Sequence, residues 1–373
     1  MTKTDDWSAE YDDGDFRVRM AGGAEDNAWD SFVQSTPGGH IAQSSLWAHV
    51  KVGSGYETGR VMVGRGGLIE GGAQFLIRRF RFVGTVAYAA HAPVVAGCEA
   101  SLYDVTVRAI HKLCRKHRVR YAIVQPPRGG DGIAAYLARS GFDVSPVSVG
   151  PTATFIVNLG RSEENLLRGM RRRTREHIRR GLREGVVVRE GDRPDLPVFY
   201  SLHALSARRH GHSPLAQSYY ERMWDLLHPF GYVRVFLAEF EGAPVASHLV
   251  LSFGDTASCF RLGWSGTHSA LGVNDLLHWH VIRWAKGAGF RFLDLEGINR
   301  PLAEMLIKGT PLSEADRRRP SFIELGYGPD AVLLPEPYGF IYDPLVRPFQ
   351  GVLTRQVRRS SMAQALLERL RDR

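Results

Sequence analysis

Residues 290–309 read FRFLDLEGINRPLAEMLIKG, in which Asp294, Glu296 and Lys308 have a spacing that suits chemistry. The apolar alternation predicts a short strand, and Asp294 and Glu296 share one face of it because side chains alternate with period two. Gly297 breaks the strand, and a short helix then delivers Lys308. Binding clefts are commonly lined by polar groups from a strand end and from the end of the next helix. An ordinary strand–loop–helix with solvated charges fits the same spacing.

The stretch LGVNDLLHWHVIRWAKGAGFRFLDLEGI resembles the signature of the FemAB family, the aminoacyl-tRNA-dependent ligases that build peptidoglycan cross-bridges. That family has a helix with "LL-W--I--A---G", then "DF-G", then an aromatic–lysine pair. The matching positions are Leu276, Leu277, Trp279, Ile282, Ala285, Gly289, Asp294 and Gly297. Ile307 and Lys308 stand where the family has Phe-Lys, so the lysine matches and the aromatic residue does not.

A second match lies near the N-terminus, where HIAQSSLWAHVK resembles the family motif "Q---W---K". Gln43, Trp47 and Lys51 recur every four residues, which predicts that all three lie on one helix face. The resemblance implies that Lys51 and Trp47 line the acceptor pocket, with Lys51 near phosphates where the acceptor is nucleotide-linked. A helix that buries Trp47 and leaves Lys51 in solvent fits the same pattern.

Eight arginines fall between Arg168 and Arg183, and only Glu176 opposes them there. The segment also resembles a family motif at Arg175, Ile178, Gly185 and Val186. Guanidinium groups along a helix can follow a phosphate backbone, so we predict tRNA binding here, although solvated basic faces are common. The predicted tRNA-binding residues are Arg171, Arg172, Arg173, Arg175, Arg179 and Arg180.

Two further residues complete the expected substrate-binding set. Arg209, in a segment that resembles the family's "R-G" pair with Gly211, is a candidate for holding an acceptor anion, and Asn274 lies in the LGVNDLL stretch. Three histidines near Arg209 lack both metal-ligand spacing and supporting carboxylates, so we expect no metal there.

The elements that must position these groups alternate between strands and helices, which predicts a mixed α/β fold with mixed sheets. The resemblance implies two tandem GNAT-like domains that face a common cleft. We expect five segments: a disordered N-terminus at 1–15, a first, acceptor-side GNAT-like domain at 16–150, a second at 151–320, a strand segment at 321–343 that returns to the first domain, and a basic C-terminal helix at 344–373. A helix of the last kind suits packing or homo-oligomer formation.

Composition narrows the class of protein. The chain has 373 residues, a net charge of +9 and a pI of about 9.6, which favours polyanionic partners, although Arg enrichment also follows from a GC-rich coding sequence. No apolar run is long enough for a transmembrane helix, and the polar, acidic start does not fit a signal peptide. Three isolated cysteines fit a reducing cytoplasm.

The reaction that the resemblance implies is transfer of an amino acid from aminoacyl-tRNA to an acceptor amine, on a peptidoglycan precursor or a small natural product. An amine attacks an activated ester, so the site needs positioning and a cation for the oxyanion rather than a metal or an organic cofactor. We assign that cation to Lys308, and amine orientation or deprotonation to Asp294 or Glu296. The alternatives are an acyl-CoA-dependent N-acyltransferase, whose phosphate loop R/Q-x-x-G-x-G/A we do not find, and a non-catalytic nucleic-acid-binding protein.

Overall fold

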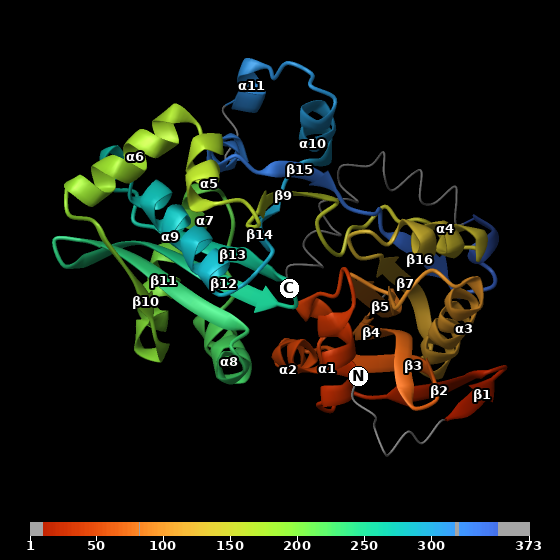
Figure 1. Cartoon of the computed structure of the whole chain (residues 1–373). Coiled ribbons are helices and arrows are strands. Elements are labelled where there is room, and N and C mark those ends of the chain that lie inside the picture. The colour runs from red at the N-terminus through yellow and green to blue at the C-terminus, as the bar shows by residue number, and fades with distance from the viewer. Residues whose placement is uncertain (1–9, 82, 318–320, 350–373) are drawn as a thin grey trace. The chain divides into compact units, whose positions relative to one another are not determined.

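The computed structural model describes residues 10–81, 83–317 and 321–349, which form two compact units. Unit 1 takes the described residues up to Thr152 and those from Leu334 onward, and unit 2 runs from Ala153 to Leu333. The first unit is therefore built from two separate stretches of the chain (Figure 1).

Unit 1 is organised around a mixed sheet, to which nine strands contribute within the described residues. Its order is β1-β2-β3-β4-β5-β7-β16-β8, with β6 paired to β4. Its elements are β1 (Tyr11–Asp13), β2 (Phe16–Ala21), α1 (Asn27–Ser35), η1 (Ile41–Gln43), α2 (Ser45–Val52), β3 (Glu57–Arg65), β4 (Leu68–Phe80), β5 (Gly84–Ala90), β6 (Val94–Val95), α3 (Ala100–Lys116), β7 (Val119–Gln125), α4 (Asp131–Arg139), β8 (Asp143–Val144), β16 (Tyr338–Ile341) and η6 (Arg347–Phe349).

The two faces of the unit 1 sheet are covered differently. Helix α3 packs on one face over an apolar core, and α1, η1 and α2 lie on the other (Figure 1). Under η1 the contacts are polar and buried: the Gln43 side chain donates to the carbonyl oxygens of Gln74 (3.0 Å) and Ala90 (2.9 Å) and accepts from the Gln74 N–H (2.8 Å). These bonds fix the segment that leads into α2 because unpaired buried polar groups would be costly.

Unit 2 contains a second mixed sheet, with seven strands among the described residues in the order β10-β11-β12-β13-β14-β9-β15. Its elements are β9 (Ala153–Asn158), α5 (Glu163–Gly169), α6 (Arg172–Arg183), β10 (Val187–Gly191), η2 (Arg193–Asp195), α7 (Leu196–Arg209), α8 (Gln217–Leu227), η3 (His228–Phe230), β11 (Val233–Phe240), β12 (Ala243–Phe253), β13 (Thr256–Trp264), η4 (Ser269–Leu271), α9 (Val273–Gly287), β14 (Phe292–Gly297), α10 (Arg300–Ile307), α11 (Glu314–Arg317), α12 (Ser321–Glu324), η5 (Leu325–Tyr327) and β15 (Asp330–Leu333).

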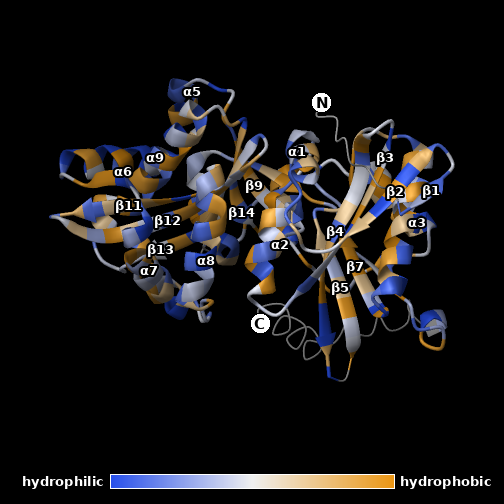
Figure 2. Ribbon diagram, turned by 90° about the horizontal axis from the view of Figure 1, so that it is seen from below, coloured by the Kyte–Doolittle hydropathy of each residue, from blue (hydrophilic) through white to orange (hydrophobic). Residues whose placement is uncertain are grey.

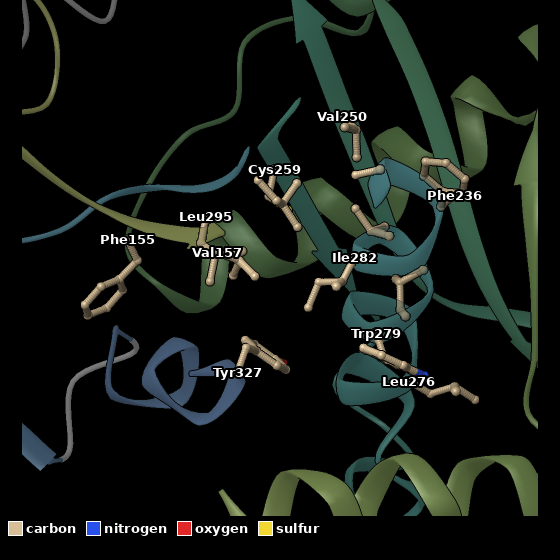
Figure 3. Packing of buried hydrophobic residues seen from close by; sticks show 14 of the residues in the cluster. Phe155, Val157, Phe236, Val250, Cys259, Leu276, Trp279, Ile282, Leu295 and Tyr327 are labelled. Atoms are coloured by element: carbon tan, nitrogen blue, oxygen red, sulfur yellow. The ribbon is translucent and has the colours of Figure 1, made fainter. Parts of the chain in front are cut away.

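Helices cover both faces of the unit 2 sheet. Helices α6 and α9 lie on one face and α7 and α8 on the other (Figure 2). Helix α7 approaches β13 so closely that a Cβ at Gly263 would lie 2.7 Å from the His203 nitrogen, so only glycine fits there. On the opposite face, Trp279 and Ile282 of α9 and Leu295 of β14 belong to one apolar core (Figure 3).

The two units repeat one topology. Each has four successive antiparallel strands, then a helix that crosses over to a strand parallel to the fourth: β2 to β5, α3 and β7 in unit 1, and β10 to β13, α9 and β14 in unit 2. The repeat extends by one more strand. On its other side, β7 pairs with antiparallel β16, and β14 pairs with antiparallel β9. The predicted mixed α/β fold with two similar halves is thus confirmed.

The C-terminal segments differ from prediction. We expected residues 321–343 to form a strand segment that returns to unit 1, but they begin with α12 and η5, and β15 then pairs with β9 inside unit 2. The strand that does return is β16, which pairs with β7 and β8. The apolar residues that suggested a strand instead form helical turns, and Tyr327 of η5 is buried in the unit 2 core.

The N-terminal expectation is also partly wrong. Residues 11–13 lie in β1, which pairs with β2, although residues 1–15 were expected to be disordered. The reason is tertiary: Glu10 pairs with Lys116 (3.0 Å) and Asp13 with Arg108 (2.8 Å), both on basic α3. Of the predicted C-terminal helix, residues 350–373 lie outside the described residues, and Arg347–Phe349 form a single 3-10 turn.

Candidate active site

The site in unit 2 begins where two parallel strands separate. β13 and β14 are paired only from Thr256 with Phe292 to Ser258 with Asp294, although β13 continues to Trp264 and β14 to Gly297. In unit 1 the corresponding strands remain paired up to Ala90 and Gln125, where both end. Ligands of α/β sheets bind where neighbouring strand ends diverge, so the end of β14 is the first place to look for chemistry.

Asp294 is held by its neighbours and shapes the end of β14. Its carboxylate accepts the hydroxyl of buried Thr154 and the backbone N–H of Glu296 (2.8 Å). The Thr154 hydroxyl also lies 2.9 Å from the Glu296 carbonyl oxygen. The register of β14 against β9 shifts between Asp294 and Gly297, so Asp294 stabilises an irregular strand end.

Glu296 occupies that irregularity in an unusual state. Its φ of 75° lies in the left-handed region, which costs a non-glycine residue of the order of 1 kcal/mol or more. Its half-buried carboxylate makes no hydrogen bond or ion pair with any described residue. Burial, followed by the nearby charges of Asp294 and Glu324, raises the pKa of Glu296 to about 8, and Arg261 partly opposes this rise. Such a carboxyl group can both take and give a proton near neutral pH.

Glu324, at the end of α12, is a third carboxyl group of this site, and the sequence analysis missed it. Burial and then the charge of Asp294 raise the pKa of Glu324 to about 8. No motif or spacing ties Glu324 to β14, so only the packing of α12 could reveal it. We call Asp294, Glu296 and Glu324 the carboxyl cluster.

Two residues of β13 adjoin the carboxyl cluster with different consequences. The positive charge of Arg261 offsets part of the rise in the pKa of Glu296. Cys259 is buried, and burial with the three nearby carboxyl groups raises the pKa of its thiol well above the usual value. A thiol in this state is a poor nucleophile, which agrees with chemistry that needs no covalent intermediate on the protein.

Lys308 lies at the C-terminal end of α10, where it is exposed and its N–H donates to the Glu304 carbonyl oxygen (3.0 Å). Its ammonium has no ion-pair or hydrogen-bond partner among the described residues. Its predicted place after the β14–α10 turn is therefore observed, and its predicted catalytic role remains a prediction.

The predicted helix face at residues 43–51 is wrong. Gln43 ends η1, whereas Trp47 and Lys51 belong to α2, because Ser44 has an extended ψ of 151° and its hydroxyl caps α2 by accepting the Trp47 N–H (3.1 Å). Trp47 is buried, and half-buried Lys51 lies with its Nζ 5.4 Å from the Trp47 ring centroid. Gln43 is thus a buried anchor, and Lys51 remains at the surface of unit 1.

Arg209 and Asn274, the other expected substrate residues, are in unit 2. The exposed Arg209 guanidinium donates to the Trp264 carbonyl oxygen, lies 4.9 Å from the Trp264 ring and fills the space that Gly266 leaves open. Arg209 therefore holds the loop after β13. Asn274 is in the first turn of α9, and its side chain has no hydrogen-bond partner among the described residues.

The arginines of α6 divide into two groups. The guanidinium groups of Arg171, Arg175 and Arg180 donate to backbone carbonyl oxygens of Phe322, Met170 and Ala270. The remaining predicted tRNA-binding residues are exposed: Arg172 pairs with Glu176, Arg173 reaches His177, and Arg179 acts on Glu176 only through its charge. A ligand can bind this second group without displacing a bond to a backbone carbonyl oxygen.

Protein side chains occupy the start of α9, where a CoA enzyme would hold a pyrophosphate. A Cβ at Gly272 would lie 2.6 Å from the Cβ of His177 on α6. In the first turn of α9, the Asp275 carboxylate lies 2.7 Å from His177 Nδ1 and accepts the Tyr327 hydroxyl (3.1 Å). A carboxylate and a closely packed helix at this position leave no cradle for a diphosphate.

Two family models match the chain. Residues 24–131 match the FemAB family, and residues 168–301 match an acetyltransferase (GNAT) domain. Each model covers less than half of the chain, so the chain is similar to the FemAB family in its first unit and to GNAT domains in its second. The FemAB match covers α2 with Lys51, and the GNAT match runs from the arginine helix α6 to the end of β14.

Individual relatives point to the same family. The Lipid II:glycine glycyltransferase of Staphylococcus saprophyticus is 28% identical over 236 residues, which are 60% of this chain and 57% of that protein. The enzyme of the same name from Staphylococcus aureus is 28% identical over 224 residues, which are 57% and 53%. The chain thus matches little more than half the length of these curated relatives.

A solved structure shares the fold. The crystal structure of FemX matches with a TM-score of 0.76 at 18% identity, over 90% of this chain and all of that one. Within the described residues, no helix is long and apolar enough to cross a membrane, and no group of three His, Cys, Asp or Glu residues is arranged to hold a metal ion.

Proposed function

We propose that this chain is an aminoacyltransferase that moves an amino acid from aminoacyl-tRNA to an amine of a peptidoglycan precursor. The observation that carries the proposal is the match to two Lipid II:glycine glycyltransferases across more than half of the chain. The tRNA donor rests on the family resemblance and on the exposed arginines of α6. The three free cysteines agree with a cytoplasmic enzyme.

In the proposed mechanism, Glu296 takes the proton of the acceptor ammonium and so frees the amine to attack the aminoacyl ester. A pKa of about 8 suits this exchange, because the carboxyl group is partly ionised at neutral pH and basic enough to accept a proton. Asp294 acts as a positioning residue, since it holds the Glu296 backbone. Lys308, whose ammonium has no partner among the described residues, stabilises the tetrahedral oxyanion. As this intermediate collapses, the acyl C–O bond to the tRNA ribose breaks, the ribose oxygen takes the proton held by Glu296, and the new amide nitrogen releases its extra proton to solvent.

The remaining site residues bind substrates in this proposal. Lys51, Trp47, Arg209 and Asn274 serve the acceptor, and the exposed arginines of α6 serve the tRNA body. The burial of Trp47 makes it a support for Lys51 rather than a direct contact. Bound substrates supply all reacting groups, so the reaction uses no metal or organic cofactor.

The test is a transfer assay with purified chain. Transfer of labelled glycine from glycyl-tRNA to lipid II is the expected result, and a pool of tRNA charged with the other amino acids identifies the donor if glycine is not used. Labelled acetyl-CoA is offered in parallel. Transfer from acetyl-CoA, with none from any aminoacyl-tRNA, would overturn the proposal, and so would binding of tRNA without any transfer. Glu296→Gln serves as the inactive control.

A further inference from the structure

Three exposed arginines lie at one end of the unit 1 sheet, where β4 turns into β5 and β7 begins. Arg118 and Arg120 flank Val119, the first residue of β7. Val119 pairs with Thr85 of β5, and Thr85 pairs with Arg79 of β4. Neighbouring strands hold their paired residues about 5 Å apart, so the register brings the three arginines together. We call this part of the molecule the hairpin end of unit 1.

Two exposed apolar side chains lie at the hairpin end as well. Val83, in the turn between β4 and β5, is 50% exposed, and Leu345, after β16, is 83% exposed. Arg120 joins the two segments: a Cβ at Gly84 would lie 2.6 Å from Arg120 Cδ, and the Arg120 carbonyl oxygen accepts the Tyr342 N–H (2.8 Å). Single exposed apolar residues are common, but these two adjoin the same arginine.

Two further arginines extend the positive charge. Arg115 is in the last turn of α3, and Arg347 begins η6, where its guanidinium carbon lies 4.2 Å from the Phe340 ring centroid. Burial, followed by the charges of Arg115 and Arg347, lowers the pKa of His111 to about 4. His111 Nδ1 lies 2.7 Å from the hydroxyl of Tyr342, so both arginines are near the segment that bonds to Arg120.

The arginines of the hairpin end differ from the paired basic residues of α3. Arg108 pairs with Asp13 (2.8 Å), and Lys116 pairs with Glu10 (3.0 Å). The hairpin-end arginines form no ion pair with any described residue: Arg79, Arg115, Arg118, Arg120 and Arg347. Five exposed positive charges without an internal partner create a potential that attracts anions.

The apolar residues indicate which anionic partner fits. Phosphates of a nucleic acid bind guanidinium groups in water and gain nothing from an exposed Leu345. An anionic bilayer suits both kinds of side chain. Its negative surface potential attracts the arginines, and the boundary between headgroups and acyl chains accepts Val83 and Leu345.

We propose that the hairpin end of unit 1 binds the surface of an anionic phospholipid membrane, with its arginines at the headgroups and Val83 and Leu345 at the acyl boundary. This interaction goes beyond the proposed function, because it needs neither an aminoacyl donor nor turnover. A peptidoglycan precursor carried on a lipid would bring the enzyme to such a surface.

The test is co-sedimentation of the full chain with vesicles, made of phosphatidylcholine alone or with about one third phosphatidylglycerol. The wild type should bind only the anionic vesicles, with an affinity that falls as salt rises. Changing Arg79, Arg118 and Arg120 to Gln should weaken this binding at least about tenfold. Absence of wild-type binding to the anionic vesicles at physiological salt would overturn the proposal.

The matched control loses the same charge from unit 2. It changes three exposed arginines to Gln: Arg161, Arg222 and Arg291. This variant should bind anionic vesicles within about twofold of the wild type, and equal weakening in both triple variants would reduce the effect to net charge and overturn the surface. The hairpin-end variant should keep wild-type affinity for tRNA. A loss of tRNA affinity equal to the loss of vesicle affinity would make the hairpin end a nucleic-acid site instead.

A variant that keeps every charge tests the apolar contact. Val83→Ser combined with Leu345→Ser should weaken binding to anionic vesicles at least about fivefold and leave its salt dependence unchanged. Unchanged affinity in this variant would overturn the lipid assignment. Its Tm should equal that of the wild type because both side chains are exposed, so it decides the matter even if the arginine variant does not fold. Failure of the transfer assay would leave these results untouched, so the two proposals fail separately.

Discussion

Glu296 and Asp294 have similar side chains and occupy alternate positions of one strand, yet their environments give them different roles. The Asp294 carboxylate is bound by a buried hydroxyl and a backbone N–H, whereas Glu296 has no hydrogen-bond partner among the described residues and a left-handed backbone. The alternation in the sequence predicted that both carboxylates lie at the strand end. It could not predict which carboxylate accepts hydrogen bonds, because that depends on Thr154 in β9 and on the register shift beside it.

The first prediction concerns the pH dependence of stability. The folded state keeps a proton on Glu296 up to about pH 8, whereas the ordinary value is 4.5, so the folded state binds more protons than the unfolded state between these values. The free energy of unfolding should therefore fall as pH rises through this window. Glu296→Gln removes this contribution, so it should be more stable than the wild type at pH 9 and comparable at pH 5. Each pKa unit is worth about 1.4 kcal/mol, which makes even part of the shift measurable.

Urea unfolding from pH 5 to 9 checks this prediction, with Glu57→Gln at an exposed position of β3 as the control. The control should follow the wild-type curve. Parallel curves for Glu296→Gln and the wild type would show that the carboxyl group titrates normally. Glu324→Gln should also flatten the curve, because its own pKa is raised to about 8.

A second prediction at the residue scale concerns Lys308. Lys308→Ala should lower kcat about a hundredfold or more while donor binding stays nearly intact, because a cation aimed at an oxyanion acts on the transition state. Lys308→Arg should rescue poorly, since a planar fork does not replace a point charge. Because Lys308 is exposed, neither change should alter Tm. Turnover within twofold of the wild type for both variants would make Lys308 an ordinary surface lysine.

At the scale of elements, periodicity predicted many helices and strands, and capping and tertiary packing decided the rest. The segment over 43–51 has helical spacing, but the Ser44 side chain starts a new helix and breaks the face. The strand expected over 321–343 is split, because Tyr327 is needed in the unit 2 core and only the part from Tyr338 pairs with β7. The local sequence pattern carries no information about these capping and packing partners.

The arginine helix allows an element-scale prediction with an internal control. Changing Arg172, Arg173 and Arg179 to Gln should weaken tRNA binding and reduce the slope of log affinity against log salt by at most about 0.7 to 0.9 per lost phosphate contact. Tm should change little, because these side chains are exposed. Changing Arg171, Arg175 and Arg180 should lower Tm instead, since their guanidinium groups bind backbone carbonyl oxygens. Equal effects of both triple variants on the salt slope would contradict this division.

At the scale of the whole molecule, the last strand of unit 1, β16, follows unit 2 in the sequence. β16 lies between β7 and β8 in the unit 1 sheet, and it buries Phe340 in the unit 1 core. Tyr342, which follows β16, has its hydroxyl 2.7 Å from His111 Nδ1 on α3. The sequence predicted that a segment returns, and the repeated topology explains why it must: β7 would otherwise be left with an open edge and an uncovered core.

Truncation after Leu333 should therefore destabilise unit 1 and spare unit 2, whose sheet is complete at β15. Without β16, β7 loses its hydrogen-bonded neighbour, and loss of the Phe340 ring from the core alone costs about 3 to 5 kcal/mol. Hydrogen exchange read by mass spectrometry should show lost protection in β5, β7 and α3 and wild-type protection in β11 to β14. The control is truncation after Phe349, which keeps β16 and should preserve protection in both units. Equal loss of protection in the two units after truncation at Leu333 would mean that they fold as one cooperative body, and unchanged protection in both would mean that β16 adds little to the first sheet.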